Sequence, residues 1–88
     1  MTIRYTSQFK KDFKRIKKQN KDLSKLQLLI ENLVNAKTLD TKYKNHGLTG
    51  SLKGYRECHI EPDWLLIYKI SVDTLILERT RSHSDLFK

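Results

Sequence analysis

The chain has 88 residues, of which 38% are hydrophobic and 32% are charged. This length excludes a multidomain protein, and the even mixture of apolar and charged residues excludes a disordered chain. Eighteen Lys and Arg against ten Asp and Glu leave a net charge of +8, which favours nucleic acid, an anionic membrane or an acidic protein as a partner. A basic surface that only contacts solvent would carry the same charge. The charge therefore indicates a function only if residues capable of chemistry accompany it.

The sequence shows no signal for export or for membrane insertion. Its single cysteine, Cys58, cannot form an intrachain disulfide, and the first residues contain no apolar segment of a secretory signal. The apolar runs at residues 26–34 and 64–70 are far shorter than the roughly 20 residues that span a bilayer. We therefore expect one cytoplasmic domain over residues 1–88 that has no contact with a membrane.

The first part of the chain predicts a strand followed by a basic helix. A β-prone run at residues 2–6 precedes Ser7, a candidate N-cap for a helix in which Phe9, Phe13 and Ile16 recur at helical spacing. Most other positions of this helix are cations, namely Lys10, Lys11, Lys14, Arg15, Lys17 and Lys18.

The rest of the chain predicts a second helix, a loop and a β-meander. A helix is expected over residues 22–36, where aliphatic side chains form a stripe at i, i+3, i+4 and i+7 spacing. Residues 38–51 lose this periodicity and carry two glycines, which predicts a loop. Hairpin-length connections then separate three β-rich runs, at residues 52–60, 64–70 and 74–82. The order predicts an α+β fold: an N-terminal strand, a helical hairpin, and a three-stranded antiparallel meander whose one face the helices cover.

Alternation along the first β-rich run separates a polar face from a core face. Glu57 and His59 share one face, whereas Cys58 points to the expected core and is a weak candidate nucleophile. Pro62 ends the run because it lacks an N–H, which places Asp63 in a tight turn. We expect Asp63 to lie near His59.

The last β-rich run changes from apolar to charged along its length. Under strict alternation, Leu75 and Leu77 share a face with Arg79 and Arg81, and His83 follows just beyond. The arginines would therefore extend an apolar face into a cationic one.

Three histidines, His46, His59 and His83, are far apart in sequence but could converge at one edge of the sheet. Histidine exchanges protons near neutral pH, which suits RNA cleavage: the 2′-hydroxyl must lose a proton and the 5′-oxygen must gain one. Arg79 or Arg81 could stabilise the anionic phosphorane between these steps. Each histidine also has a plain alternative, as a packed strand residue, a loop residue or a surface residue.

Metal sites and base-stacking sites have weaker support. No HExxH, CxxC or similarly compact ligand pair is present, so we expect no metal and no cofactor. Trp64 and Phe87 could stack on the bases of a single strand. Either could equally belong to the core, although Phe87, near the chain end, has fewer reasons to be buried.

Two longer segments carry a resemblance to a known family. The sequence YKNHGLTGSLKGYRECHIEPDWLLIYKI, followed by LERTRSHSDLF, resembles the RelE/YafQ-type bacterial toxins, most closely the YafQ branch. The resemblance covers nearly the whole chain, including the order of elements and the NHGLTG, HIEPDW and SHSDLF motifs. It implies a RelE-like fold and the toxin of a type II toxin–antitoxin system.

The resemblance also implies an activity, partners and roles. The toxin would be a metal-independent endoribonuclease that cleaves mRNA in the ribosomal A site, and an acidic, partly disordered antitoxin would hold it inactive. His83 would be the general acid, Phe87 would hold the displaced base, and the base or base-orienting group would be Asp63 or one of His46 and His59. The implied RNA contacts are Trp64, Arg79, Arg81 and the six cations of the first helix.

Two other readings of the same residues remain open. A non-catalytic module that binds RNA or the ribosome would use the same basic surface and aromatic residues, with histidines that only pack. A plain interaction protein would use the cationic helix to bind an acidic partner. Substitution of the histidines separates these readings, because only an enzyme loses cleavage while it keeps binding.

Overall fold

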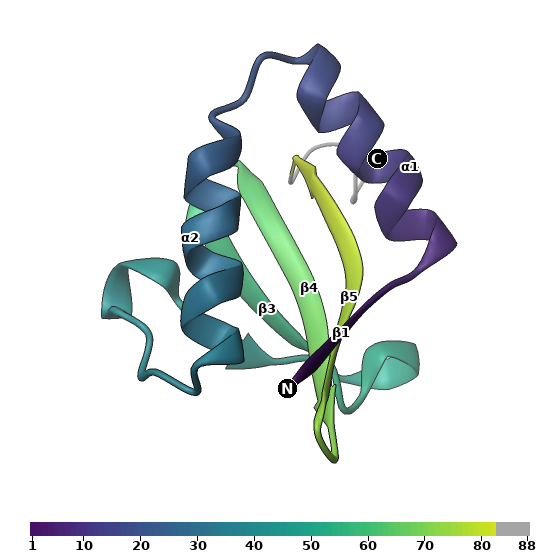
Figure 1. Ribbon diagram of the computed structural model, residues 1–88, viewed down its shortest axis with the longest axis vertical. Helices are drawn as coiled ribbons and strands as arrows, with labels where there is room; N and C mark the ends of the chain where they lie inside the picture. Colours follow the sequence, from purple (N-terminus) through teal and green to yellow (C-terminus); the bar gives the residue numbers. More distant parts are fainter. Residues whose placement is uncertain (83–88) are drawn as a thin grey trace.

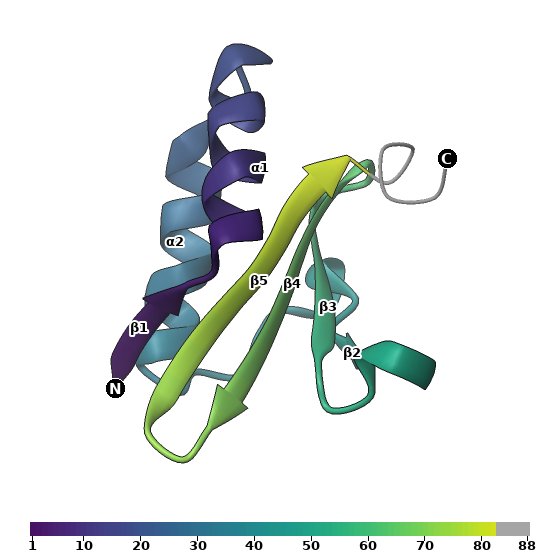
Figure 2. The same cartoon turned by 90° about the vertical axis from the view of Figure 1, so that its right-hand side faces the viewer.

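The computed structural model describes residues 1–82, which form two layers (Figures 1 and 2). One layer is a sheet and the other is a pair of α-helices that covers one face of it. The helices are α1 (Ser7–Lys18) and α2 (Leu23–Val34), and the strands are β1 (Thr2–Tyr5), β2 (His46–Gly47), β3 (Arg56–Glu61), β4 (Trp64–Ser71) and β5 (Thr74–Ser82). Short 3₁₀ turns lie at Thr41–Tyr43 and Gly50–Leu52.

The sheet confirms the predicted α+β class and adds two details to it. The strand order is β1-β5-β4-β3-β2, with β3, β4 and β5 forming the expected antiparallel meander. β1 pairs with β5 in parallel, so the sheet is mixed rather than purely antiparallel. β2 lies inside the segment predicted as a loop, because its two residues are too few to give a periodic signal.

Both helices begin at a side-chain cap. The hydroxyl of Thr6, not of Ser7 as predicted, accepts the N–H of Phe9 at 3.0 Å and caps α1. Thr6 also donates to the carbonyl of Glu78 at 3.0 Å, which fixes the start of α1 against β5. Asp22 caps α2 in the same way. Neither helix of the described chain is long and apolar enough to cross a membrane.

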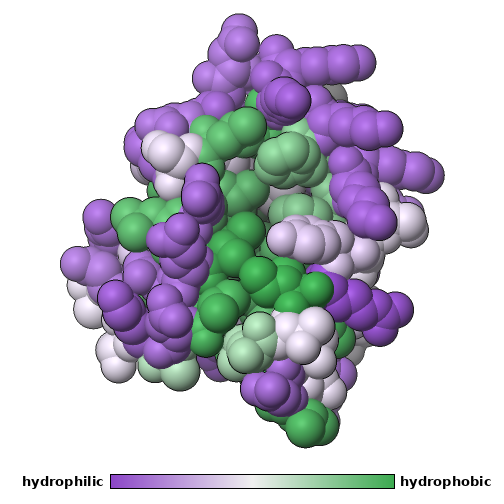
Figure 3. Space-filling model, viewed as in Figure 1, coloured by the Kyte–Doolittle hydropathy of each residue, from purple (hydrophilic) through white to green (hydrophobic). Residues whose placement is uncertain are grey.

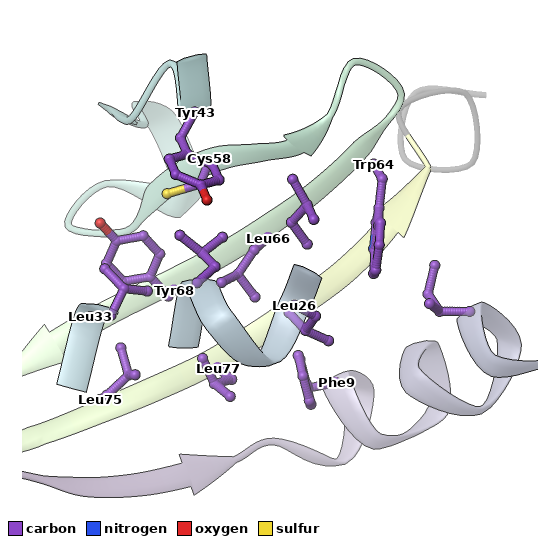
Figure 4. Close-up of a cluster of buried hydrophobic side chains, with 13 residues drawn as sticks. Phe9, Leu26, Leu33, Tyr43, Cys58, Trp64, Leu66, Tyr68, Leu75 and Leu77 are labelled. Carbon is purple, nitrogen blue, oxygen red and sulfur yellow. The ribbon is translucent and has the colours of Figure 1, made fainter. Parts of the chain in front are cut away.

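The hydrophobic core lies between the helices and the sheet. Figure 4 shows Phe9 and Leu26 facing Leu66 and Leu77, with Trp64 in the same layer. Trp64, Leu66 and Leu77 have no exposed surface. Full burial of a large apolar side chain contributes roughly 1.5–3 kcal/mol, so this layer is the main source of stability.

A β-bulge changes the alternation of β5. Tyr68 of β4 pairs with Leu77, but the preceding Ile67 pairs with Arg79, so Glu78 is one extra residue. Leu77 and Thr80 therefore both face the helices. The prediction that Arg79 and Arg81 share the face of the leucines is wrong, because an inserted residue moves every later side chain to the other face. The bulge therefore turns the two arginines away from the core.

The two hairpin connections agree with the predicted ones. Pro62 and Asp63 join β3 to β4, and Val72 and Asp73 join β4 to β5. Val72 has a φ of 54° and a fully exposed side chain. This valine occupies the left-handed region, which β-branched residues rarely adopt.

Candidate active site

The face of the sheet away from the helices carries two rows of side chains that run across β3, β4 and β5. The register places His59, Leu65 and Arg81 in one row and Glu57, Ile67 and Arg79 in the next. The two central residues of these rows are buried. Each row thus has an acid–base group on β3 and an arginine on β5, separated by an apolar residue.

Glu57 lies between the two described histidines. One of its carboxylate oxygens, Oε1, is 3.4 Å from Nε2 of His46 and 3.8 Å from Nε2 of His59. The Glu57 side chain is only 9% exposed, whereas those of His46 and His59 are 50% and 21% exposed. The carboxylate is therefore shielded and the imidazoles are accessible, as a proton-transfer site requires.

The orientation of the His46 ring follows from its backbone partner. Nδ1 lies 2.7 Å from the carbonyl oxygen of Lys44, and because a carbonyl only accepts, Nδ1 donates. Nε2 is then the nitrogen that faces Glu57. The pairing of His46 with Glu57 in the β2–β3 ladder holds the two residues side by side.

Asn45 attaches the loop that carries His46 to the sheet. Its amide donates to the hydroxyl of Tyr68 at 2.9 Å, and its carbonyl accepts from Nε of Arg56, also at 2.9 Å. Tyr68 is only 2% exposed and belongs to the core. The chain alternates at this point, so Asn45 binds the core side while His46 reaches the open face.

The two arginines of the open face share one carboxylate. The side chains of Arg79 and Arg81 are 25% and 20% exposed, and both approach Asp12 of α1. Neither pairing was expected from the sequence, because Asp12 is far away along the chain. Among residues 1–82, no three His, Cys, Asp or Glu side chains have an arrangement that suits a metal ion.

Trp64 does not fit its expected role as an RNA contact. Its ring is fully buried, and its indole N–H donates to the hydroxyl of Thr80 at 2.9 Å. A side chain packed in the core offers no face to a base, so the burial of Trp64 argues against the expected RNA contact. Asp63 lies in the β3–β4 turn, as predicted, and is exposed there.

Two predicted site residues, His83 and Phe87, lie outside the described residues. Conversely, the sequence reasoning did not select Glu57, Asn45 or Asp12 as members of the site. Strand alternation had already placed Glu57 beside His59, and this was the signal available for it. No local pattern marks the other two.

Cys58 faces the core, as alternation predicted, and has no exposed surface. Burial raises the pKa of its thiol to about 11, although a hydrogen bond with Tyr68 acts in the opposite direction. The residue is therefore a protonated thiol at neutral pH and a poor nucleophile.

The opposite side of the molecule presents a basic helix beside an apolar groove. All six cations of α1 are exposed. Between the two helices, Figure 3 shows a hydrophobic band flanked by hydrophilic surface. This band is a groove of about 770 Å³, and its apolar lining includes Tyr5, Phe9, Phe13, Leu23 and Ile30.

Comparison with known proteins places the chain in a family. The sequence model of the family described as "Bacterial toxin of type II toxin-antitoxin system, YafQ" matches residues 1–88. The chain is 48% identical over 86 residues to the mRNA interferase toxin YafQ of Escherichia coli, covering 97% of this chain and 94% of that protein.

Solved structures give the same result. The crystal structure of YafQ from E. coli matches with a TM-score of 0.92 and 46% identity, over 98% of this chain and 97% of that one. A chain of the crystal structure of the E. coli DinJ–YafQ complex matches with a TM-score of 0.89 and 47% identity, over 98% and 97% of the two chains. The chain therefore belongs to the YafQ family of bacterial toxins from type II toxin–antitoxin systems.

Proposed function

We propose that this toxin is an mRNA interferase that cleaves mRNA in the ribosomal A site. The arrangement of Glu57 between His46 and His59, with Arg79 and Arg81 on the same face of the sheet, carries the proposal. The name of the E. coli relative, an mRNA interferase toxin, supports the same substrate.

The proposed reaction uses acid–base chemistry of side chains. His46 or His59 accepts the proton of the 2′-hydroxyl, and Glu57 stabilises the imidazolium that forms; Asp63 is the alternative base. The 2′-oxygen attacks phosphorus, and the bond from phosphorus to the 5′-oxygen breaks. His83 gives its proton to that oxygen, so the products are a 2′,3′-cyclic phosphate and a 5′-hydroxyl.

Two further groups act on the substrate in this proposal. Arg79 and Arg81 stabilise the charge of the phosphorane, because charge-assisted hydrogen bonds strengthen as negative charge develops. Phe87 stacks on the displaced base, an interaction worth ~1–3 kcal/mol. Proton transfer by positioned groups typically contributes ~10²–10⁴-fold to the rate, so it is the larger effect to test.

Partners follow from the basic helix and the groove. We propose that the six exposed cations of α1 dock on ribosomal RNA, which predicts an affinity that falls with salt. A crystal structure of the E. coli DinJ–YafQ toxin–antitoxin complex shows that a relative binds an antitoxin. The cognate antitoxin of this chain would place apolar side chains in the groove between α1 and α2 and acidic ones beside the lysines, and would order as it binds.

The experiment is primer extension on mRNA, with and without programmed ribosomes, for wild type and His83→Ala. Lys37→Ala, at an exposed position between α2 and β2, is the control for an arbitrary surface change. We expect cuts that require both ribosomes and His83. Wild-type protein that binds ribosomes but never cuts would instead identify a non-catalytic binding module.

A further inference from the structure

Asp12 is a buried carboxylate at the junction of α1 and β5. Its side chain is 6% exposed. Oδ2 accepts from Nε of Arg79 at 2.7 Å and from the backbone N–H of Thr80 at 3.2 Å, and Oδ1 accepts from Nη2 of Arg79 at 3.3 Å. Nε of Arg81 lies 3.8 Å from Oδ1, beyond hydrogen-bond distance. The carboxylate therefore binds Arg79 through two parallel hydrogen bonds, whereas it lies near Arg81 without a hydrogen bond to its Nε.

The position of Asp12 in α1 is unusual for an acidic residue. It is the only acidic residue of a helix whose polar positions are otherwise mostly cationic, and it is buried with Phe9 and Ile16 on the face toward the sheet. Burial of a carboxylate is unfavourable unless it is fully paired, and a well-packed apolar side chain often serves stability as well. Apolar packing thus gives no reason for a carboxylate here, and the bond from the backbone N–H of Thr80 needs only one oxygen, which an uncharged amide could also supply.

The arginines that Asp12 contacts lie on the open face, in register with the residues of the candidate active site. Arg79 uses two of its five N–H donors on Asp12, which leaves three for a substrate. Nε of Arg81 is buried toward Asp12 and makes no hydrogen bond within residues 1–82. The pair therefore combines one guanidinium of fixed orientation with one that Asp12 does not hold, and Arg81 would contact RNA through its two terminal NH₂ groups.

We propose that Asp12 is a positioning residue for phosphate binding in this toxin. It does not touch RNA; it holds the guanidinium of Arg79 at the angle that meets the scissile phosphate and leaves Arg81 free to complete the contact. This inference rests on the proposed function and deepens it. Its physical basis is preorganisation, since a misplacement of about 1 Å at a reacting centre can lower the rate by ~10²-fold.

The test is a double-mutant cycle on the rate of cleavage at saturating ribosomes. Asp12→Asn keeps the shape of the side chain but removes its charge and one acceptor, and we expect kcat to fall roughly 10–100-fold. In an Arg79→Gln background, Asp12→Asn should change kcat by less than about twofold, because its target is absent. Asp73→Asn, the same substitution at an exposed turn at the far end of β5, is the matched control.

A structural role for Asp12 gives different results. If Asp12 only stabilises the fold, its effect should persist in the Arg79→Gln background and should follow the folded fraction measured by urea unfolding. That outcome overturns the inference. If Asp12→Asn does not fold, Asp12→Glu takes its place in the cycle, because it shifts the carboxylate by one methylene and its effect should again require Arg79.

A second measurement does not depend on cleavage. In ¹⁵N-labelled protein, the Nε–H signal of Arg79 should be protected from solvent exchange in wild type and should lose that protection in Asp12→Asn. Binding of an RNA oligonucleotide with a 2′-deoxy cleavage site should weaken in the same variant. Wild type that never cleaves RNA would refute the proposed function alone, whereas unchanged Arg79 exchange together with unchanged oligonucleotide binding would refute the role of Asp12.

Discussion

Trp64 donates its indole N–H to the hydroxyl of Thr80 across 2.9 Å, and neither residue has any exposed surface. This bond joins β4 to β5 on the face that the helices cover. The lone tryptophan of the chain is thus a core residue close to the site, and its substitution should affect stability first.

Trp64→Phe should lower the free energy of unfolding by about 2–4 kcal/mol. The smaller ring leaves a cavity, and the hydroxyl of Thr80 loses its donor in a buried place, which itself costs roughly 1–3 kcal/mol. Urea unfolding of Trp64→Phe, Thr80→Val and the double variant measures the coupling. We expect a coupling of about 1 kcal/mol, and strictly additive losses would show that the bond contributes nothing.

Glu57→Gln should reduce mRNA cleavage by ~10²-fold or more while ribosome binding is retained. The amide has the shape of the carboxylate but cannot stabilise a positive charge on His46 or His59. Initial rates of cleavage on programmed ribosomes measure the effect. Glu31→Gln, at an exposed position of α2, removes the same charge elsewhere; equal rates for the two variants would exclude a catalytic contribution of Glu57.

Tyr68→Phe should slow cleavage roughly 10–100-fold, because loss of the hydroxyl releases Asn45 and with it the loop that orients His46. Tyr5→Phe removes a hydroxyl from an exposed tyrosine of β1 and is the control. Cleavage rates are compared at a temperature at which both variants are folded. An unchanged rate for Tyr68→Phe would mean that the β2–β3 pairing alone positions His46.

The protein should lose stability in alkali between pH 9 and pH 11. Burial raises the pKa of Cys58 from its ordinary 9.0 to about 11, so the folded state holds the thiol proton more tightly than the unfolded chain does. The resulting stabilisation is complete below pH 9 and disappears as the pH rises through 11. Burial also raises the pKa of Tyr68 and acts in the same direction.

The measurement is urea unfolding from pH 8 to pH 11 for wild type and Cys58→Ala. The variant is less stable throughout because of its cavity, but its curve should fall less steeply, by at most about 3 kcal/mol over this range. Parallel curves would show that Cys58 does not titrate with folding.

The sequence determined the class of the fold because its signals were local. The apolar stripe of α2 and the short connections around β4 are features of a few neighbouring residues, and the structure confirms them. The bulge at Glu78 escaped prediction because it depends on how β4 and β5 align, which no residue of β5 reveals alone. The parallel pairing of β1 with β5 likewise joins segments that are far apart in sequence, so no local pattern predicts it.

The candidate site divides in the same way. His46, His59 and Asp63 were selected by residue type and strand position, and the structure brings the two histidines together around Glu57. Asp12 could not be found because its importance arises from residues more than sixty positions away. Hydrophobic periodicity reports only the repeat within one helix or strand, so it cannot predict a buried polar pair between distant elements.

The strained backbone at Val72 can be relieved by substitution, which would stabilise the fold without changing the candidate active site. A β-branched residue in the left-handed region costs roughly 1–2 kcal/mol, and glycine suits this first turn position of a two-residue hairpin. Val72→Gly should therefore stabilise the toxin by about 1 kcal/mol, after the extra entropy of glycine in the unfolded chain is subtracted. The turn lies at the opposite end of the β4–β5 hairpin from Trp64. Destabilising substitutions near the histidines or arginines can thus be introduced into a Val72→Gly background that remains folded.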